Sequence, residues 1–350
     1  EAFIDSAVDY IFEYSNPQNI EAFMEYLDKG GDKLAIDGIL SRRDAYKSQG
    51  KRGRNEYMLP DRKSTARYRD KYSYFGYRPA AIMEFGLGCS KVCEFCLRWR
   101  IEGAKEELID LELFKKDLKT IQEPTIMFID NDFFASQEKI QTFISIIEEL
   151  ALEKNYIVYA SVKGVLESSK SLERFIELGL KAVLVGYESF DDAEMEGYNK
   201  ASDTDDNLKA SKLLKRLGVD VWASFIAHPD WTKDDFKSMR SYIKLLGPEI
   251  SSINPLTPFP NLPMYKDYED RLIYSKEDYE AWSFGQVTIR PLKMSLRSYY
   301  YELLKTNLYV NLFINKKTDM INRFGVKNII RILFGSLKAL GKYTLLMIKN

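Results

Sequence analysis

The chain has 350 residues, of which 45% are hydrophobic and 29% are charged, and this is the composition of a globular protein rather than a disordered one. The 51 Lys and Arg residues nearly balance the 52 Asp and Glu residues, so the net charge of -1 excludes a uniformly basic nucleic-acid-binding protein. A single histidine, His228, excludes zinc and iron sites built from several histidines.

Residues 1–77 predict an N-terminal helical segment that is followed by a connector. Two short helices are expected within 1–40, because apolar residues recur at helical spacing around Tyr10 and again around Phe23. Residues 41–71 hold 11 Lys or Arg against four Asp or Glu, a local charge of +7, which favours a solvated linker over an RNA-stacking surface. No secretory signal opens the chain, and residues upstream of its first position are expected because it starts inside a predicted helix.

Residues 78–275 predict an α/β core in which short apolar runs alternate with amphipathic stretches. The expected strands are 80–85, 125–129, 156–161, 182–186, 221–227 and 250–256. The expected helices are 106–120, 136–153, 168–178, 205–217 and 232–246. This alternation predicts βαβ units and a parallel sheet. Since six units are two fewer than a complete barrel needs, either an open six-unit barrel or a doubly wound sheet is expected.

Residues 276–350 predict a C-terminal helical region. Residues 305–350 contain nine Lys or Arg and one Asp, a charge of +8, and a basic amphipathic helix is expected near 325–348. Its apolar stripe could pack onto the barrel, which is the favoured interpretation, or lie in a membrane interface with its cations on anionic headgroups. No run of 18 uncharged apolar residues occurs, so no transmembrane helix is expected.

All three cysteines of the chain lie within eight residues, at Cys89, Cys93 and Cys96, and an odd number so spaced is not a disulfide framework. Thiolates favour zinc, copper(I) or iron–sulfur clusters, but structural zinc normally needs four ligands, and neither a fourth cysteine nor a nearby histidine is present. Three cysteines can instead hold three irons of a [4Fe–4S] cluster and leave the fourth iron open. Because they follow the first predicted strand, they are expected at the edge of the sheet where α/β active sites form.

The spacing Cys-x3-Cys-x2-Cys after the first strand of a βα repeat resembles the radical S-adenosylmethionine (radical SAM) superfamily. Phe95, just before the third cysteine, stands where that family places an aromatic residue against the adenine. The resemblance implies a partial (β/α)6 barrel of the TIM type and a [4Fe–4S] cluster on Cys89, Cys93 and Cys96. It also implies that the open iron binds SAM, which is cleaved reductively to a 5′-deoxyadenosyl radical.

Further segments resemble the cobalamin-binding branch of that family, which includes anaerobic magnesium-protoporphyrin ester cyclases and many methyltransferases. These segments are 129–134 after the second strand, the Gly-x-Glu-Ser sequence within 185–189, and the turn at 256–260. By this resemblance the cofactor-binding residues are Phe95, Asp130, Lys163, Glu188 and Ile226. The chain lacks the Asp-x-His-x-x-Gly motif of the branch's cobalamin domain, so cobalamin would be held by a domain outside this chain.

The sequence therefore predicts a radical SAM enzyme for cobalamin-dependent methyl transfer or oxidative cyclisation of an unknown small molecule. A cobalamin-independent radical SAM enzyme is one alternative, and a non-catalytic iron–sulfur or zinc-binding module is another. The expected partners are a small-molecule substrate and an electron donor such as flavodoxin or ferredoxin, with no nucleic acid. Because oxygen destroys such clusters, a reducing, cytoplasmic location is expected, with membrane association through the C-terminal helix as a further option.

No catalytic acid or base is assigned from the sequence. Asp130 and Asp132 could act as catalytic acids or bases, or they could cap the helix that follows them. His228 ends the fifth predicted strand, and a plain loop histidine is favoured there over a role in positioning SAM or substrate.

Overall fold

A computed structural model describes residues 8–30, 36–42, 56–315, 324–325, 330, 334 and 341–347. The chain divides into two compact units. The N-terminal unit comprises Glu1–Ser64 and Leu108–Ile121, and the barrel unit comprises Thr65–Glu107 and Gln122–Asn350.

The N-terminal unit contains a small antiparallel pair of strands and two helices. Strand β1 (Tyr10–Phe12) pairs with β2 (Ile39–Ser41), and the helices are α1 (Pro17–Lys29) and α4 (Leu111–Thr120). The helix predicted around Tyr10 is therefore wrong, because its aromatic and β-branched residues pair as a strand. The second predicted helix is confirmed as α1, which begins at an Asn16 capping box followed by proline.

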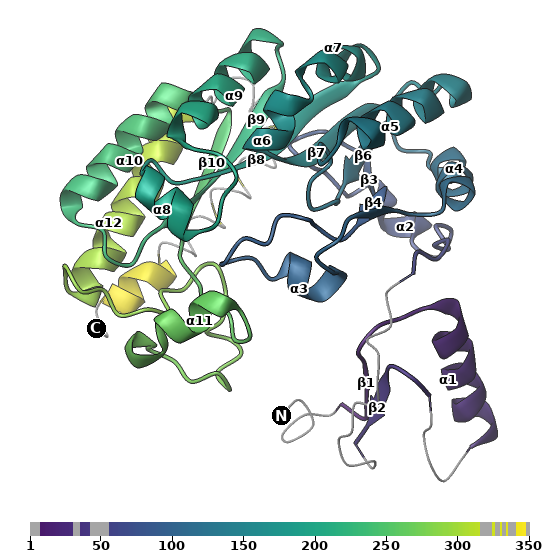
Figure 1. Cartoon of the computed structure of the whole chain (residues 1–350), viewed down its shortest axis with the longest axis horizontal. Coiled ribbons are helices and arrows are strands. Elements are labelled where there is room, and N and C mark those ends of the chain that lie inside the picture. The colour runs from purple at the N-terminus through teal and green to yellow at the C-terminus, as the bar shows by residue number, and fades with distance from the viewer. Residues whose placement is uncertain are drawn as a thin grey trace. The chain divides into compact units, whose positions relative to one another are not determined.

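The barrel unit is built on six parallel strands. They are β3 (Ala80–Met83), β6 (Thr125–Phe128), β7 (Asn155–Ser161), β8 (Leu180–Glu188), β9 (Asp220–Ala227) and β10 (Ile250–Pro255). Their order in the sheet is β10-β9-β8-β7-β6-β3, and each neighbouring pair is parallel. Each of these strands lies beside the one that precedes it in the chain, so the strand order runs in one direction across the sheet. In a doubly wound sheet the strand order reverses at a switch point. The partial barrel is thus confirmed, and each predicted strand lies within two residues of the observed one (Figure 1).

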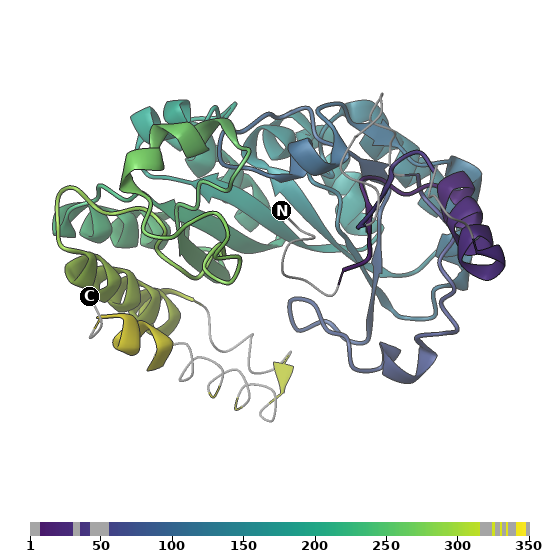
Figure 2. The same cartoon turned by 90° about the horizontal axis from the view of Figure 1, so that it is seen from below.

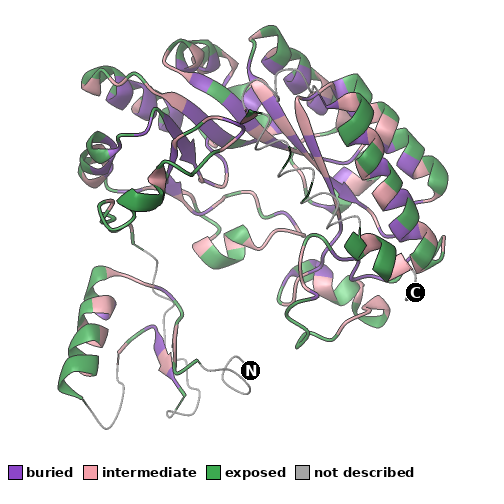
Figure 3. Cartoon of the chain, turned by 180° about the vertical axis from the view of Figure 1, so that it is seen from behind, coloured by how far each residue is buried: buried purple, intermediate pink, exposed green. Residues whose placement is uncertain are grey.

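Helices follow the strands and cover one face of the curved sheet (Figures 1 and 2). They include α5 (Gln137–Leu150), α6 (Val162–Glu167), α7 (Ser169–Glu177), α9 (Thr204–Arg216), α10 (Lys233–Leu246) and α12 (Leu296–Tyr309). Shorter elements are α2 (Ala66–Arg69), β4 (Gly86–Leu87), α3 (Arg98–Glu102), β5 (Glu107–Leu108), α8 (Asp192–Gly197), α11 (Pro263–Asp267), a 3-10 helix (Glu269–Arg271) and a π-helix (Val310–Ile314). The sheet and the inward helix faces are buried (Figure 3), so the core lies between them.

An aromatic cluster fills the space between the sheet and its covering helices. Phe143 of α5 is at its centre, with ring centroids 4.9 Å from Phe133, 5.0 Å from Phe128, 5.5 Å from Tyr156 and 5.2 Å from Phe175. All four contacts are edge-to-face, the arrangement that aromatic quadrupoles favour. The opposite face of the sheet is consequently left free to form a binding cavity.

Helix α12 and part of the segment after it pack within the barrel unit. Tyr299 of α12 donates its hydroxyl to the carbonyl oxygen of Ala227 at 2.9 Å, and the rings of Tyr300 and Tyr343 lie 5.8 Å apart. Most of the amphipathic helix predicted near 325–348 lies outside the described residues, although 341–347 are helical. Within the described ranges, no helix has the length and apolarity needed to cross a membrane.

A partly buried carboxylate joins the loop after β8 to the loop after β9. Glu194 accepts hydrogen bonds from the hydroxyl of Ser189 and the indole nitrogen of Trp231. Burial raises the pKa of Glu194 to about 7, and these two hydrogen bonds offset only part of that rise. The folded protein therefore binds a proton at Glu194 more tightly than the unfolded chain does.

We predict that this carboxylate makes folding stability depend on pH. Its contribution is fully present near pH 4 and is lost as the pH rises through about 7, a difference of about 3 kcal/mol. Glu194→Gln, which stays neutral, should remove that loss. Anaerobic urea unfolding between pH 5 and 8 measures it, with the exposed Glu196→Gln as the control. Equal pH dependence in parent and Glu194→Gln would contradict the assignment.

Candidate active site

The three cysteines lie in the loop between β4 and α3, beyond the end of the first barrel strand. The backbone N–H of Cys89 donates to the carbonyl oxygen of Gly103 at 3.0 Å. The indole nitrogen of Trp99 donates to the carbonyl oxygen of Cys93 at 2.9 Å. These bonds anchor the backbone of the loop at Cys89 and at Cys93.

The three thiols fit a cluster better than a single metal ion. All are free, and burial raises the pKa of each, that of Cys93 to about 11. Among the described residues, no three His, Cys, Asp or Glu side chains converge as a single metal ion requires. In a [4Fe–4S] cluster each cysteine binds a different iron, so the sulfurs need not converge on one point. Cluster binding would also stabilise the thiolates that burial disfavours.

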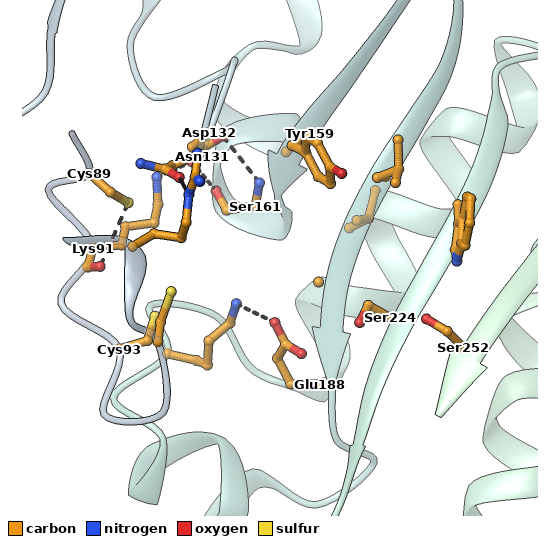
Figure 4. A pocket seen from close by; sticks show the side chains of 18 of the residues that line it. Cys89, Lys91, Cys93, Asn131, Asp132, Tyr159, Ser161, Glu188, Ser224 and Ser252 are labelled. Atoms are coloured by element: carbon orange, nitrogen blue, oxygen red, sulfur yellow. Dashed lines mark hydrogen bonds and ion pairs between the residues drawn. The ribbon is translucent and has the colours of Figure 1, made fainter. Parts of the chain in front are cut away.

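A cavity of about 520 Å³ lies between the cysteine loop and the inner face of the sheet (Figure 4). All three cysteines and Phe95 line it, together with polar groups that follow the strands. Figure 4 shows Lys91, Asp132 and Ser161 on one side of the opening and Glu188 on the other, with Ser224 and Ser252 farther along the sheet.

Asp132 connects the cysteine loop to the strand ends. It forms an ion pair with Lys91, which stands between the first two cysteines. It also accepts hydrogen bonds from the hydroxyl of Ser161 at 2.7 Å and from the backbone N–H groups of Ser161 and Phe134 at 3.1 and 3.2 Å. A carboxylate with this many donors is held in one orientation, which is suited to positioning the loop.

A second buried ion pair faces the cysteines. Lys200 Nζ lies 3.1 Å from Glu188 Oε1, and both side chains are almost fully buried. Glu188 has a left-handed backbone, with φ of 61°, at a register shift in β8. A Cβ at Gly186 would lie 2.3 Å from the Glu188 carboxylate, so only glycine leaves room there. Burial lowers the pKa of Lys200, but Glu188 and Cys93 outweigh it, so the net pKa is raised.

Asp130 has a different position from Asp132 and does not line the cavity. Its side chain is fully buried, accepts a hydrogen bond from the Phe85 N–H at 2.8 Å, and lies 2.8 Å from Lys139 Nζ. The prediction that one of these carboxylates caps the following helix is wrong, because the α5 cap is Ser136. Asp130 is placed to hold the end of β3 against β6 and α5.

The other predicted cofactor-binding residues are not all brought together. Phe95 lines the cavity, with its ring 5.5 Å from that of Tyr198. Ile226 is buried in an apolar cluster against which Phe95 packs, so these two predicted residues belong to one group, although Ile226 does not line the cavity. Lys163 lies on the exposed side of α6, 3.8 Å from Glu167, and does not line the cavity.

His228 lies outside the cavity lining, in the loop after β9. Its Nε2 is 3.2 Å from the Tyr268 hydroxyl, and its Nδ1 accepts the backbone N–H of Asp230 at 3.2 Å. Burial lowers its pKa, so the neutral ring is favoured. These contacts fit the interpretation of a plain loop histidine.

Sequence reasoning missed Lys91, Lys200 and Trp222 as parts of the site. Lys91 could have been noticed, because it lies inside the cysteine spacing. No local pattern marks Lys200, whose proximity to Glu188 depends on the loop and helix between them.

Comparison with known proteins agrees with this geometry. Residues 83–243 match the model of the radical SAM superfamily. The chain is 24% identical to hopanoid C-3 methylase of Methylococcus capsulatus over 86% of this chain and 58% of that protein. It is 24% identical to an anaerobic magnesium-protoporphyrin IX monomethyl ester cyclase of Rubrivivax gelatinosus, over 71% of this chain and 45% of that protein. The chain thus spans about half the length of these relatives.

A solved structure shows the same fold. The radical S-adenosylmethionine methyltransferase TsrM of Kitasatospora setae, with cobalamin and a [4Fe-4S] cluster bound, superposes with a TM-score of 0.56. The two share 11% sequence identity, over 75% of this chain and 54% of the other.

We predict that Gly88 is essential to the cysteine loop. Its φ is +85°, and an added Cβ would lie 2.1 Å from the carbonyl oxygen of Lys105. Gly88→Ala should therefore displace Cys89 and lower iron bound per chain severalfold after anaerobic reconstitution. Gly197→Ala is the matched control, because no atom lies within 4 Å of its added Cβ. Normal iron content in Gly88→Ala would show that the loop tolerates the displacement.

Proposed function

The chain carries a radical SAM domain, and from this premise we propose that it is an enzyme for methyl transfer or oxidative cyclisation of a small organic molecule. The observation that supports the proposal best is the placement of three free cysteines over a cavity at the mouth of a partial barrel. A non-catalytic iron–sulfur module would not need such a cavity beside the thiols.

The roles follow from which groups line the cavity. Cys89, Cys93 and Cys96 would ligate a [4Fe–4S] cluster, and Phe95 and Glu188 would hold SAM beside it. When bound, the cluster supplies the electron that cleaves SAM to methionine and a 5′-deoxyadenosyl radical. Lys200 pairs with Glu188 and orients its carboxylate, whose oxygens can accept hydrogen bonds.

The choice between methyl transfer and cyclisation rests on the relatives, one named a methylase and another a cyclase. We propose cobalamin as a further cofactor, held by a domain outside this chain, because the superposed TsrM structure contains it. Contacts of Asp130, Lys163 and Ile226 with SAM stay predictions, since none of the three lines the cavity.

For partners we propose a flavodoxin or ferredoxin as the electron donor, in a reducing cytoplasm. For the C-terminal segment 305–350, with a charge of +8, packing onto the barrel is the favoured interpretation, and contact with an anionic membrane surface is the alternative. Co-sedimentation with anionic vesicles checks this contact, which should be lost when the chain ends at Asn322.

We predict that the anaerobically reconstituted protein binds about four irons per chain and, with dithionite and SAM, releases 5′-deoxyadenosine. Cys93→Ala should lose both the iron and the product, because one cluster ligand is removed. Iron analysis and chromatography of the products measure the two. Tight binding of one zinc with no iron uptake would refute the proposal.

Glu188→Ala should separate SAM binding from cluster binding. We expect SAM affinity to fall at least tenfold while iron content stays unchanged, because Glu188 lines the cavity without being a thiol ligand. Equilibrium dialysis with SAM measures this, with the exposed Glu196→Ala as the control. If Glu188→Ala instead loses its iron, Glu188 supports the loop rather than SAM.

A further inference from the structure

Side chains from neighbouring barrel strands form the wall of the half of the cavity that is farther from the cysteines. Tyr159, Leu184 and Trp222 are register partners on the adjacent strands β7, β8 and β9, and all three line the cavity. One level farther from the cysteines lie Met127 and Ile157, which line it as well. We call the part formed by these five residues, with Tyr74 and Phe75, the far half.

The charged groups of the cavity belong to its other half. They come from the cysteine loop, from α3, and from segments at or beyond the ends of β6 and β8: Lys91, Arg98, Asp132, Glu188 and Lys200. Figure 4 shows the labelled members of this group near the cysteines, with Ser224 and Ser252 farther along the sheet. The far half therefore offers a surface without formal charge.

The floor of the far half comes from the segment that precedes the barrel. Tyr74 and Tyr77 exchange two backbone hydrogen bonds, of 3.1 and 2.8 Å, which close a tight turn. Phe75 within that turn has a φ of 54°, an unusual conformation for an aromatic residue, and its buried ring lies 6.0 Å from that of Trp222. The turn therefore forms the floor of the far half, and Phe75 packs it against Trp222 of the wall.

A few hydrogen-bonding groups in and next to the far half are unused. Within the described part of the chain, the hydroxyls of Tyr159, Ser224 and Ser252 and the indole N–H of Trp222 show no hydrogen-bond partner, and all four residues line the cavity. An apolar wall with a small number of free polar groups is the usual composition of a site for a neutral organic ligand.

We propose that the far half binds an uncharged, mostly apolar substrate that carries one or two hydroxyl or carbonyl groups. Moving the apolar part of such a substrate from water onto this surface is favourable. A charged group on the substrate would lose its hydration there, and the far half has no opposite charge to compensate for that loss. The free hydroxyls and the indole N–H would orient the few polar atoms of the substrate. This inference rests on the proposed function and adds the substrate class to it.

The test uses two fluorescent probes that share one ring skeleton. N-phenyl-1-naphthylamine is uncharged, and 1-anilinonaphthalene-8-sulfonate adds one negative charge. Both are titrated into the cluster-loaded full chain with SAM present and no reductant, so no turnover occurs. We expect one uncharged probe per chain, bound at least tenfold more tightly than the sulfonate.

Charges introduced on the wall localise the binding. Leu184→Lys and Tyr159→Lys should each weaken the uncharged probe at least tenfold; Tyr159 is 39% exposed, so its variant is the safer one for folding. Leu245→Lys, at a 65% exposed position on α10, is the matched control and should bind like the parent. Unchanged iron content and SAM affinity in the variants show that the rest of the site is intact.

Three results would overturn the inference. They are displacement of the probe by SAM, equal or tighter binding of the sulfonate, and probe affinity that is unaffected by both wall variants. Because the titration needs no SAM cleavage, it can fail while 5′-deoxyadenosine is still released, and that combination rejects the substrate class without rejecting the enzyme.

Discussion

The cysteine loop depends on two carboxylates that follow β6. Asp130 accepts the backbone N–H of Phe85, just after β3, and pairs with Lys139 of α5. Asp132, two residues later, pairs with Lys91 inside the loop and accepts hydrogen bonds from Ser161 at the end of β7. Removing one partner of such a buried pair typically costs about 3–5 kcal/mol, because the other charge is left uncompensated. The same contacts therefore stabilise the barrel mouth and fix the position of the thiols.

The barrel and its cysteines could be predicted because their signals are local. Buried parallel strands appear in a sequence as short apolar runs. The spacing of the three cysteines by itself indicates an iron–sulfur cluster. The helix predicted around Tyr10 was wrong because the structure of that segment depends on a distant strand. Its apolar residues fit a helical face, but its pairing with β2, about thirty residues away, decides the outcome. A helical period in so short a segment does not exclude a strand.

The finer composition of the site was not predictable, since it depends on residues brought together from several elements. Asp130 and Asp132 are near neighbours in sequence, yet only Asp132 lines the cavity. Lys200 pairs with Glu188 at the end of β8, next to a register shift and with a left-handed backbone that no sequence pattern marks. Lys163 lies on an exposed helix face and Ile226 in an apolar cluster against which Phe95 packs, and their contacts with SAM stay predictions. Family resemblance places a motif on the right strand, but it does not fix each side chain.

Backbone strain is concentrated around this site. Among the described residues, five non-glycine positions have positive φ, and one of them, Ala151, ends helix α5. Of the others, Phe75 and Glu188 line the cavity, Asn199 donates to the carbonyl oxygen of Val92 in the cysteine loop, and the carbonyl oxygen of Asn261 accepts from Arg100 of α3. Asparagine tolerates this conformation, but for Phe75 and Glu188 it costs about 1–2 kcal/mol each, so it persists only where the surrounding contacts outweigh that cost. The fold thus maintains strain where side chains must face the cysteines or the cavity floor, as a preorganised binding site requires.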